Sequence, residues 1–393
     1  MPVKTVYADN AGTTALSNTA LEAMMPFLTK NFGNPSGIYS IGRNAKAGLE
    51  DARTRMALSI GADPGEVFFT GGGTEANNWA IRGIAEAKAS KGKHIISSKI
   101  EHHAVTHTCD YLKKHGYDIT WLPVDKFGRI SPDDLRAAFR SDTVLVSIMT
   151  ANNEIGTIEP IKELSDITHE HGALFHTDAV QAVGHIPVNV RDSGVDMLSL
   201  SAHKFRGPKG VGALYIRKGV SPAVFIYGGG QEKTRRSGTE NVAGALGMAA
   251  ALEEAVRDME KNMIRVSEMR DRLISELLKI PFSRLTGDPV NRLPGTASFV
   301  FECIEGESLV LMLDRQGICA SSGSACSSGS PDPSHVLTAI GLPYDVAHGS
   351  LRLSINECTT DEDIDCILDT IPPIVEKLRA MSPLWEDRIN GKY

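Results

Sequence analysis

Short apolar runs, spaced through the first half of the chain, constrain the fold more than any other feature. They cover residues 66–70, 94–98, 119–124, 143–149, 173–177, 197–201 and 212–216. Each run is nearly continuous rather than alternating, which is typical of parallel strands buried on both faces. Residues 161–171 lie between two of these runs, with apolar positions at helical spacing and Gly172 as a stop. The pattern predicts an α/β fold in which helices cover a mostly parallel mixed sheet.

The pattern changes after about residue 248. We predict one long charged helix over residues 250–278, strands at 297–302 and 350–355, and a closing helix at 361–381. At 393 residues the chain is long enough for more than one core. We therefore predict a large domain over residues 15–255 and a smaller α+β C-terminal domain over residues 256–393. Residues 1–14 are expected to pack near the smaller one.

The charge balance and the cysteine content exclude several classes of protein. With 41 Lys+Arg against 48 Asp+Glu, the net charge of −7 disfavours nucleic acid as a partner. No apolar run approaches the ~18 residues of a membrane-spanning helix, and we find no targeting peptide at the start. Six cysteines are too few for a disulfide framework in this chain. We therefore expect a cytoplasmic protein, most simply an enzyme, with no membrane partner.

A glycine-rich turn follows the first apolar run. Residues 70–74 (TGGGT) connect that run to a predicted helix. Glycines let the backbone approach a ligand, and a helix N-terminus offers free N–H groups, so the turn can seat a phosphate. A tight strand-to-helix turn with no ligand is the alternative. The order of the glycines matches neither the dinucleotide fingerprint nor the P-loop.

Two further polar groups stand at strand carboxyl ends, where parallel sheets bind ligands. Asp178 and Gln181 follow the run at 173–177, and Lys204 follows the run at 197–201. Asp178 could instead cap a helix, and Lys204 could be a solvated surface residue. Together these groups match the needs of pyridoxal 5′-phosphate. The glycine-rich turn would bind its phosphate, the carboxylate its pyridinium nitrogen and the lysine its aldehyde. The sequence thus predicts this cofactor.

Motifs spread along nearly the whole chain carry a family resemblance. They are NPSG (34–37), TGGGTEANN (70–78), EHHAV (101–105), ANNEIGT (151–157), FHTDAVQAVG (175–184), SAHKFRGPKGVG (201–212), GGGQEKTRRSGTENV (228–242), SSGSACSSGS (321–330) and HGSLRLS (348–354). With them the chain resembles the NifS/IscS-type cysteine desulfurases, which are pyridoxal-phosphate transferases of fold type I in the class-V aminotransferase group. The resemblance implies conversion of L-cysteine to L-alanine, with the sulfur passing to an enzyme cysteine as a persulfide and then to iron–sulfur cluster assembly.

The resemblance also implies a role for each matching residue. Lys204 would form the Schiff base and move the Cα proton, Cys326 would take the sulfur, and His102 would stack on the ring and assist proton transfer. The cofactor-binding residues would be Gly73, Thr74, His102, Asn153, Asp178, Gln181, Ser201, His203, Lys204 and, from a second subunit, Thr239. Asn153 and Arg352 would bind the substrate carboxylate. The role of Thr239 implies a homodimer.

The segment that contains Cys326 has an unusual composition. Residues 321–330 are mostly Ser and Gly, which bury little surface. We therefore expect a flexible loop with an exposed thiol that can move between the active site and an acceptor, as a sulfur carrier must. The alternative is that Cys326 is an exposed cysteine without a function. Cys319 lies in an apolar run and is predicted to be an inert core thiol.

We predict no resident metal ion. His102, His103, His107 and Cys109 lie close together in sequence, but their spacing matches no common zinc pattern. The resemblance leaves only Cys326 as a transient ligand of an iron–sulfur cluster.

The resemblance implies a NifU- or IscU-like iron–sulfur scaffold as the sulfur acceptor. The tail at residues 381–387 (MSPLWED) offers Trp385 as an anchor for it; the alternative is a tail packed on its own domain. Other functions stay open at this stage. A selenocysteine lyase or a class-V aminotransferase would use the same cofactor, and the latter would not need Cys326. A non-catalytic iron–sulfur assembly platform would not need Lys204 or Asp178.

The chain departs from the family pattern at a few positions. It has Ala11 and Gly12 where Asn and Ala are usual, Tyr39 where His is commoner, and Ala202 where Gly is usual. The first three lie in segments expected to close over the substrate. We expect them to affect rate and substrate preference rather than cofactor binding.

Overall fold

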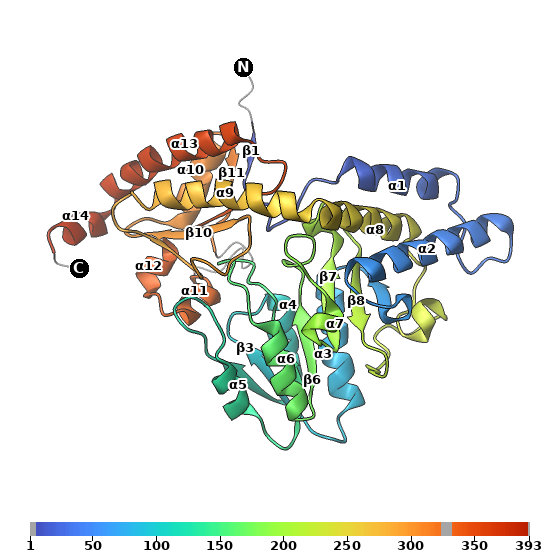
Figure 1. The fold of residues 1–393 in the computed structure, drawn as a ribbon. Helices are drawn as coiled ribbons and strands as arrows, with labels where there is room; N and C mark the ends of the chain where they lie inside the picture. Colours follow the sequence, from blue (N-terminus) through green and yellow to red (C-terminus); the bar gives the residue numbers. More distant parts are fainter. Residues whose placement is uncertain (1–4, 324–331, 392–393) are drawn as a thin grey trace.

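The larger part of the molecule is built on a mixed sheet that is mostly parallel (Figure 1). The computed structural model describes residues 5–323 and 332–391. Among these residues the largest sheet has seven strands, in the order β2-β8-β7-β6-β5-β3-β4. β8 runs antiparallel to both of its neighbours, β2 and β7, and the other neighbouring pairs are parallel. The strands are β2 (Val67–Thr70), β3 (His94–Ser98), β4 (Asp118–Leu122), β5 (Thr143–Ser147), β6 (Leu174–Asp178), β7 (Met197–Ser201) and β8 (Gly212–Ile216).

Both faces of this sheet are buried, which explains why its strands are nearly continuous apolar runs. On β5, for example, Leu145 packs into the cluster formed with α3 and α4, whereas Val146 packs into the cluster on the opposite face. The helices of this part are α1 (Asn18–Thr29), α2 (Ser40–Ser59), α3 (Gly73–Ala87), α4 (His103–Lys114), α5 (Pro132–Ala138), α6 (Ile161–Glu170), α7 (Val190–Ser193) and α8 (Val242–Arg257), with the short 3₁₀ helices η1 (Pro64–Glu66), η2 (Ala202–Lys204) and η3 (Gln231–Thr234). The predicted α/β architecture is confirmed.

The remaining residues form a smaller α+β arrangement with an apolar cluster of its own. Its antiparallel sheet has the order β12-β10-β9, and β1 pairs in parallel with β11. The cluster joins residues between Val266 and Val375 with Val6 and Ala8. The elements are β1 (Val6–Tyr7), α9 (Met259–Leu277), β9 (Ser283–Leu285), β10 (Thr296–Phe301), α10 (Gly306–Asp314), β11 (Ile318–Cys319), α11 (His335–Ala339), α12 (Tyr344–His348), β12 (Ser350–Ser354), α13 (Asp361–Ala380) and α14 (Pro383–Ile389). The domain boundary at residues 255 and 256 stays a prediction.

The single long helix predicted over residues 250–278 is wrong. The chain forms α8 and α9, which meet at Asp258, where φ is −98° and ψ is 5°. α8 packs with α1 and α2, whereas α9 packs with α13 and β10 (Figure 1). The break therefore lets the chain pass from one cluster to the other. No helix among the described residues is long and apolar enough to cross a membrane.

Candidate active site

A cavity of about 290 Å³ lies where the central strands end. It is lined by all of the predicted site residues that the structure describes except Thr239: Gly73, Thr74, His102, Asn153, Asp178, Gln181, Ser201, His203, Lys204 and Arg352. Thr239 is exposed, and its predicted role in a second subunit's site stays a prediction. Cys326 lies outside the described residues. Ala11, Gly12, Asn77, Met149, Ala151 and Val180 complete the lining, and none of these was predicted as a site residue.

Asp178 ends β6 and presents a buried carboxylate to the cavity. Its Oδ1 accepts a hydrogen bond from the backbone N–H of Val180 at 3.0 Å, and its Oδ2 accepts one from Asn77 Nδ2 at 2.6 Å. Asn77 is itself buried, and its Oδ1 has no hydrogen-bond partner among the described residues. Asn77 was missed by the sequence analysis. Its position four residues after Gly73, hence on the same face of α3, was the available signal.

Lys204 reaches the cavity from η2, directly after β7. Its Nζ donates to the carbonyl oxygens of Ala11 and Gly12 at 2.5 and 2.7 Å. Gln181 Nε2 also donates to the Ala11 carbonyl, at 2.9 Å. The N-terminal segment therefore forms one wall of the cavity, although the sequence predicted only that it packs near the smaller domain. It does contact that part of the chain, because the Ala11 N–H donates to Ser354 Oγ of β12.

Two histidines of the site are neutral near pH 7. His102 caps the N-terminus of α4, where its Nδ1 accepts from the Ala104 N–H at 3.1 Å. Burial lowers the pKa of His102, Lys204 adds to this, and Asp178 opposes it. Burial, with the charges of Lys204 and Lys209, also lowers the pKa of His203 to about 4. Because Nδ1 of His102 is an acceptor, the proton of its neutral ring is on Nε2.

Two glycines of the turn are constrained for different reasons, Gly73 by close packing and Gly72 by its backbone conformation. A Cβ on Gly73 would lie 2.6 Å from Val180 Cγ2, and Gly72 has a φ of 150°. Gly73 begins α3, so the free N–H groups of its first turn face the cavity end that Thr74, Ser201 and His203 line. This arrangement can receive a phosphate.

Arg352 projects from β12 of the smaller sheet and is buried. Its Nη1 donates to the Asn153 carbonyl at 2.9 Å, and its Nη2 pairs with Asp9 Oδ1 at 2.8 Å. It is thus the cationic group that the smaller sheet contributes to the cavity.

Among the described residues, the other histidines and cysteines near the site are not arranged as a metal centre. No group of three or more His, Cys, Asp or Glu residues in the described part of the chain is arranged to hold a metal ion. The rings of His103 and His107 stack at 4.8 Å between centroids. Burial raises the pKa of both Cys109 and Cys319, which keeps these thiols protonated. Cys319 is nevertheless only partly buried.

Comparison with known proteins identifies the family. Residues 6–367 match the family model described as aminotransferase class-V. The chain belongs to the class-V aminotransferases. Within this family it groups with the cysteine desulfurases: a protein of Methanosarcina thermophila named "Cysteine desulfurase IscS" is 55% identical, with 97% of this chain and 94% of that protein covered. A protein of the same name from Dictyoglomus turgidum is also 55% identical, over 98% of this chain and 99% of its own length.

Solved structures agree with this assignment. One titled "NIFS-LIKE PROTEIN" has a TM-score of 0.91 at 38% identity and covers 95% of this chain and 100% of its own. A NifS-like protein from Rickettsia africae has a TM-score of 0.87 at 30% identity, and the match covers 95% of this chain and 100% of that one. The predicted family and fold are therefore confirmed.

Class-V aminotransferases and cysteine desulfurases depend on pyridoxal phosphate, which confirms the predicted cofactor. The cavity fits it on three counts. Lys204 supplies an amine, Asp178 supplies a buried carboxylate held by Asn77, and the Gly72–Gly73 turn leaves room for a phosphate at the start of α3.

Proposed function

We propose that the protein is a cysteine desulfurase that converts L-cysteine to L-alanine. The observation that carries this proposal is a single cavity lined by the Lys204 amine, the Asp178 carboxylate and the Arg352 guanidinium. The first two suit the cofactor, and the third suits the carboxylate of an amino acid. The names of the relatives at 55% identity support the same activity.

Bound pyridoxal phosphate supplies an electron sink for the α-carbon of the amino acid. The chain supplies the groups that hold the cofactor and move protons. Asp178, whose Oδ2 accepts a hydrogen bond from the Asn77 amide, would pair with the ring nitrogen of the cofactor. His102 is neutral and can take up a proton, and the Lys204 amine can carry one to or from the α-carbon.

The sulfur leaves by transfer to Cys326. In the proposed step the Cys326 thiolate attacks the substrate sulfur, the S–S bond forms, and the Cβ–S bond breaks with its electron pair staying on the carbon skeleton, which is protonated to alanine. L-Cysteine and one thiol thus give L-alanine and one persulfide, with no external oxidant. Arg352 would hold the substrate carboxylate throughout.

The test measures L-alanine formed from L-cysteine by the purified holoenzyme. Cys326→Ala should keep the cofactor absorbance yet abolish alanine formation. Cys358→Ala is the matched control, because Cys358 is an exposed free cysteine outside the cavity. Full turnover by Cys326→Ala would contradict the proposal, and transfer of the amino group to an added oxo acid would favour an aminotransferase instead.

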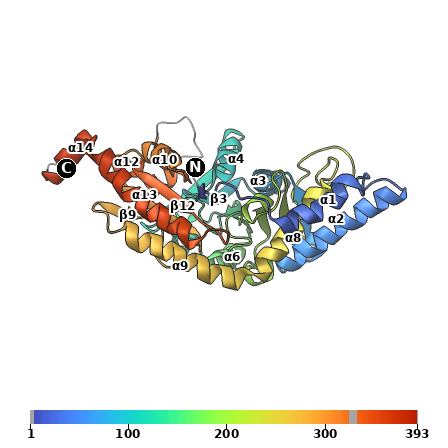
Figure 2. The ribbon, with the colours of Figure 1, turned by 90° about the horizontal axis from the view of Figure 1, so that it is seen from above.

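We also propose a homodimer whose interface includes α1 and α2. The segments from α1 to α2 expose many apolar side chains: Leu21, Met25, Leu28, Phe32, Ile38, Tyr39 and Leu58. Ile38 is 90% exposed and Phe32 is 68% exposed, which is unusual for such residues unless a partner covers them. Figures 1 and 2 show α1 and α2 at the end of the molecule opposite α14.

A mixing experiment tests both the dimer and the role of Thr239. If Thr239 completes the partner's site, a mixture of inactive Lys204→Ala and Thr239→Ala proteins should regain activity, because one site in each heterodimer has both native residues. No recovery after subunit exchange would contradict a role in trans.

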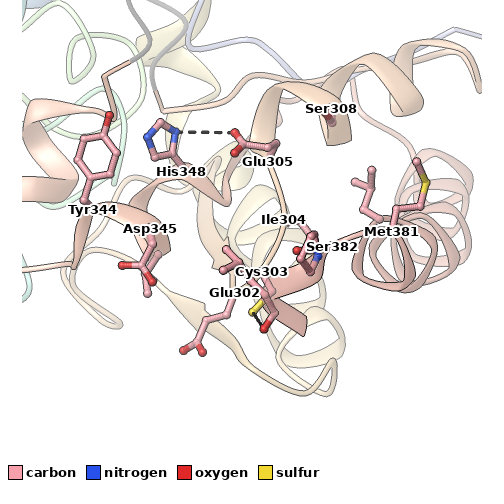
Figure 3. A pocket seen from close by; sticks show the side chains of 14 residues that line it. Glu302, Cys303, Ile304, Glu305, Ser308, Tyr344, Asp345, His348, Met381 and Ser382 are labelled. Carbon is pink, nitrogen blue, oxygen red and sulfur yellow. Dashed lines mark hydrogen bonds and ion pairs between the residues drawn. The ribbon is translucent and has the colours of Figure 1, made fainter. Parts of the chain in front are cut away.

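For the sulfur acceptor we propose an iron–sulfur scaffold that docks in the cytoplasm beside α14. Trp385 is not a free anchor, since its ring packs edge-on against Phe282 with centroids 5.6 Å apart and Arg379 lies over it. The neighbouring side chains Met381 and Leu384 are exposed and line a cavity of about 560 Å³. Figure 3 shows this cavity with Met381 labelled. An apolar anchor from the scaffold would fill it.

Substitution of this cavity tests the docking surface. Leu384→Asp should weaken binding of a purified scaffold without changing alanine release. Val290→Asp, at an exposed position outside both this cavity and the proposed dimer interface, should not weaken it. Equal binding by both variants would count against this surface.

A further inference from the structure

The guanidinium of Arg352 already has an anionic partner within the chain. Asp9 Oδ1 lies 2.8 Å from Nη2, and the Asn153 carbonyl takes Nη1. Nε has no hydrogen-bond partner among the described residues, although it is buried. A substrate carboxylate that binds this guanidinium must therefore share its single positive charge with Asp9 or displace Asp9 from it.

The side chain of Asp9 is exposed enough to leave Arg352 when a substrate carboxylate binds. Its side chain is 28% exposed, whereas that of Arg352 is 5% exposed. Asp9 does not itself line the cavity, but it lies two residues before Ala11, which does. A carboxylate at this position can turn toward solvent at little cost, which the buried arginine cannot do.

Gly12 leaves room for the carboxylate of Asp9. A Cβ on residue 12 would lie 2.5 Å from Asp9 Oδ2, which is closer than any van der Waals contact allows. The atom it would meet is the end of a flexible side chain, so an alanine at this position would move the Asp9 carboxylate rather than unfold the turn. The presence of glycine at position 12 thus permits the Asp9–Arg352 pair.

We propose that Asp9, for which Gly12 leaves space, competes with amino-acid carboxylates for Arg352. The inference rests on the proposed function, because it takes Arg352 as the carboxylate site. By lowering the affinity of the pocket for any α-carboxylate, Asp9 favours release of the alanine product. The net affinity of the site for the substrate then comes from the substrate's other contacts in the cavity.

Equilibrium binding of L-alanine to the holoenzyme tests this competition, with the cofactor absorbance as the signal. Asp9→Asn should lower the Kd for L-alanine by at least about tenfold, because removing a like charge several ångströms away at an effective dielectric constant near 20 is worth more than one factor of ten. Gly12→Ala should lower it in the same direction. The two effects should not add in the double variant, because both act through one contact.

Asp258→Asn is the matched control, since Asp258 also pairs with an arginine but at the surface. It should leave the Kd unchanged. Without amino acid, Asp9→Asn should unfold at a lower temperature than this control because Arg352 loses its partner. An unchanged or higher Kd in Asp9→Asn overturns the competition. Should Arg352→Lys leave alanine binding unchanged, the carboxylate site in the proposed function is wrong instead.

Discussion

The contact between Asn77 and Asp178 allows a substitution whose effect depends on pH in a calculable way. Asn77→Asp replaces the amide that donates to Asp178 by a carboxyl of the same shape, at an atom-to-atom distance of 2.6 Å. Both residues are buried, so water screens the new pair poorly. The variant must therefore either hold two adjacent negative charges or keep a proton between them.

The magnitudes decide between these states. Two unit charges 2.6 Å apart repel by about 6 kcal/mol at an effective dielectric constant of 20. Protonating an ordinary carboxyl at pH 7 costs about 4 kcal/mol. The proton is thus retained at pH 7, and the O–H of the introduced carboxyl donates to Asp178 as the amide did. Its folded-state pKa rises from about 4 to about 8.5, so the variant loses about 1.4 kcal/mol of stability per pH unit over that interval.

The assay is urea unfolding of wild type and variant between pH 5 and pH 9, with cofactor absorbance measured in parallel. The variant should keep the cofactor at pH 6 to 7 and lose it above about pH 8.5, when the introduced carboxyl ionises. Asn77→Leu introduces no second carboxyl, so its stability loss should not keep growing between pH 7 and pH 9. A pH-independent difference between Asn77→Asp and wild type would refute the reasoning.

Two other buried charges yield predictions. Arg53→Met leaves Glu232 buried without its two 2.8 Å contacts to the guanidinium. The free energy of unfolding should fall by about 3–5 kcal/mol, and adding Glu232→Leu should restore part of it. Urea unfolding measures both variants, and equal stability of the single and double variants would count against this prediction. Burial raises the pKa of Glu154 to about 7 from 4.5. Its contribution to stability is therefore complete below about pH 4.5 and lost as pH rises through about 7. Glu154→Gln should make the stability profile flatter over that range, and profiles of equal slope would contradict the assignment.

The fold could be predicted where burial on both faces leaves a local signal. β3, β7 and β8 have the bounds expected from their apolar runs, because such runs are short and end at polar or turn residues. The break at Asp258 could not be predicted, since residues 250–278 have helical propensity throughout. It results from packing against two different clusters, which only the tertiary structure determines.

The site could be predicted where one residue type is needed for one piece of chemistry. Lys204 and Asp178 stand at strand ends, and that position alone directs them to a cavity. The contacts of Lys204 with the Ala11 and Gly12 carbonyls could not be predicted, because they join residues about 190 positions apart through backbone atoms that have no sequence signature. Asn77 was not predicted because it contacts Asp178 rather than a ligand, and a contact between two side chains distant in sequence has no local signature.

The central claim is that Lys204 binds the cofactor aldehyde, and covalent trapping tests it most directly. The holoenzyme is reduced with borohydride, digested, and the modified peptide is sequenced by mass spectrometry. We predict one modified lysine, Lys204. A cofactor adduct on any other lysine, or a cofactor that washes out unreduced from a fully loaded enzyme, would contradict the account.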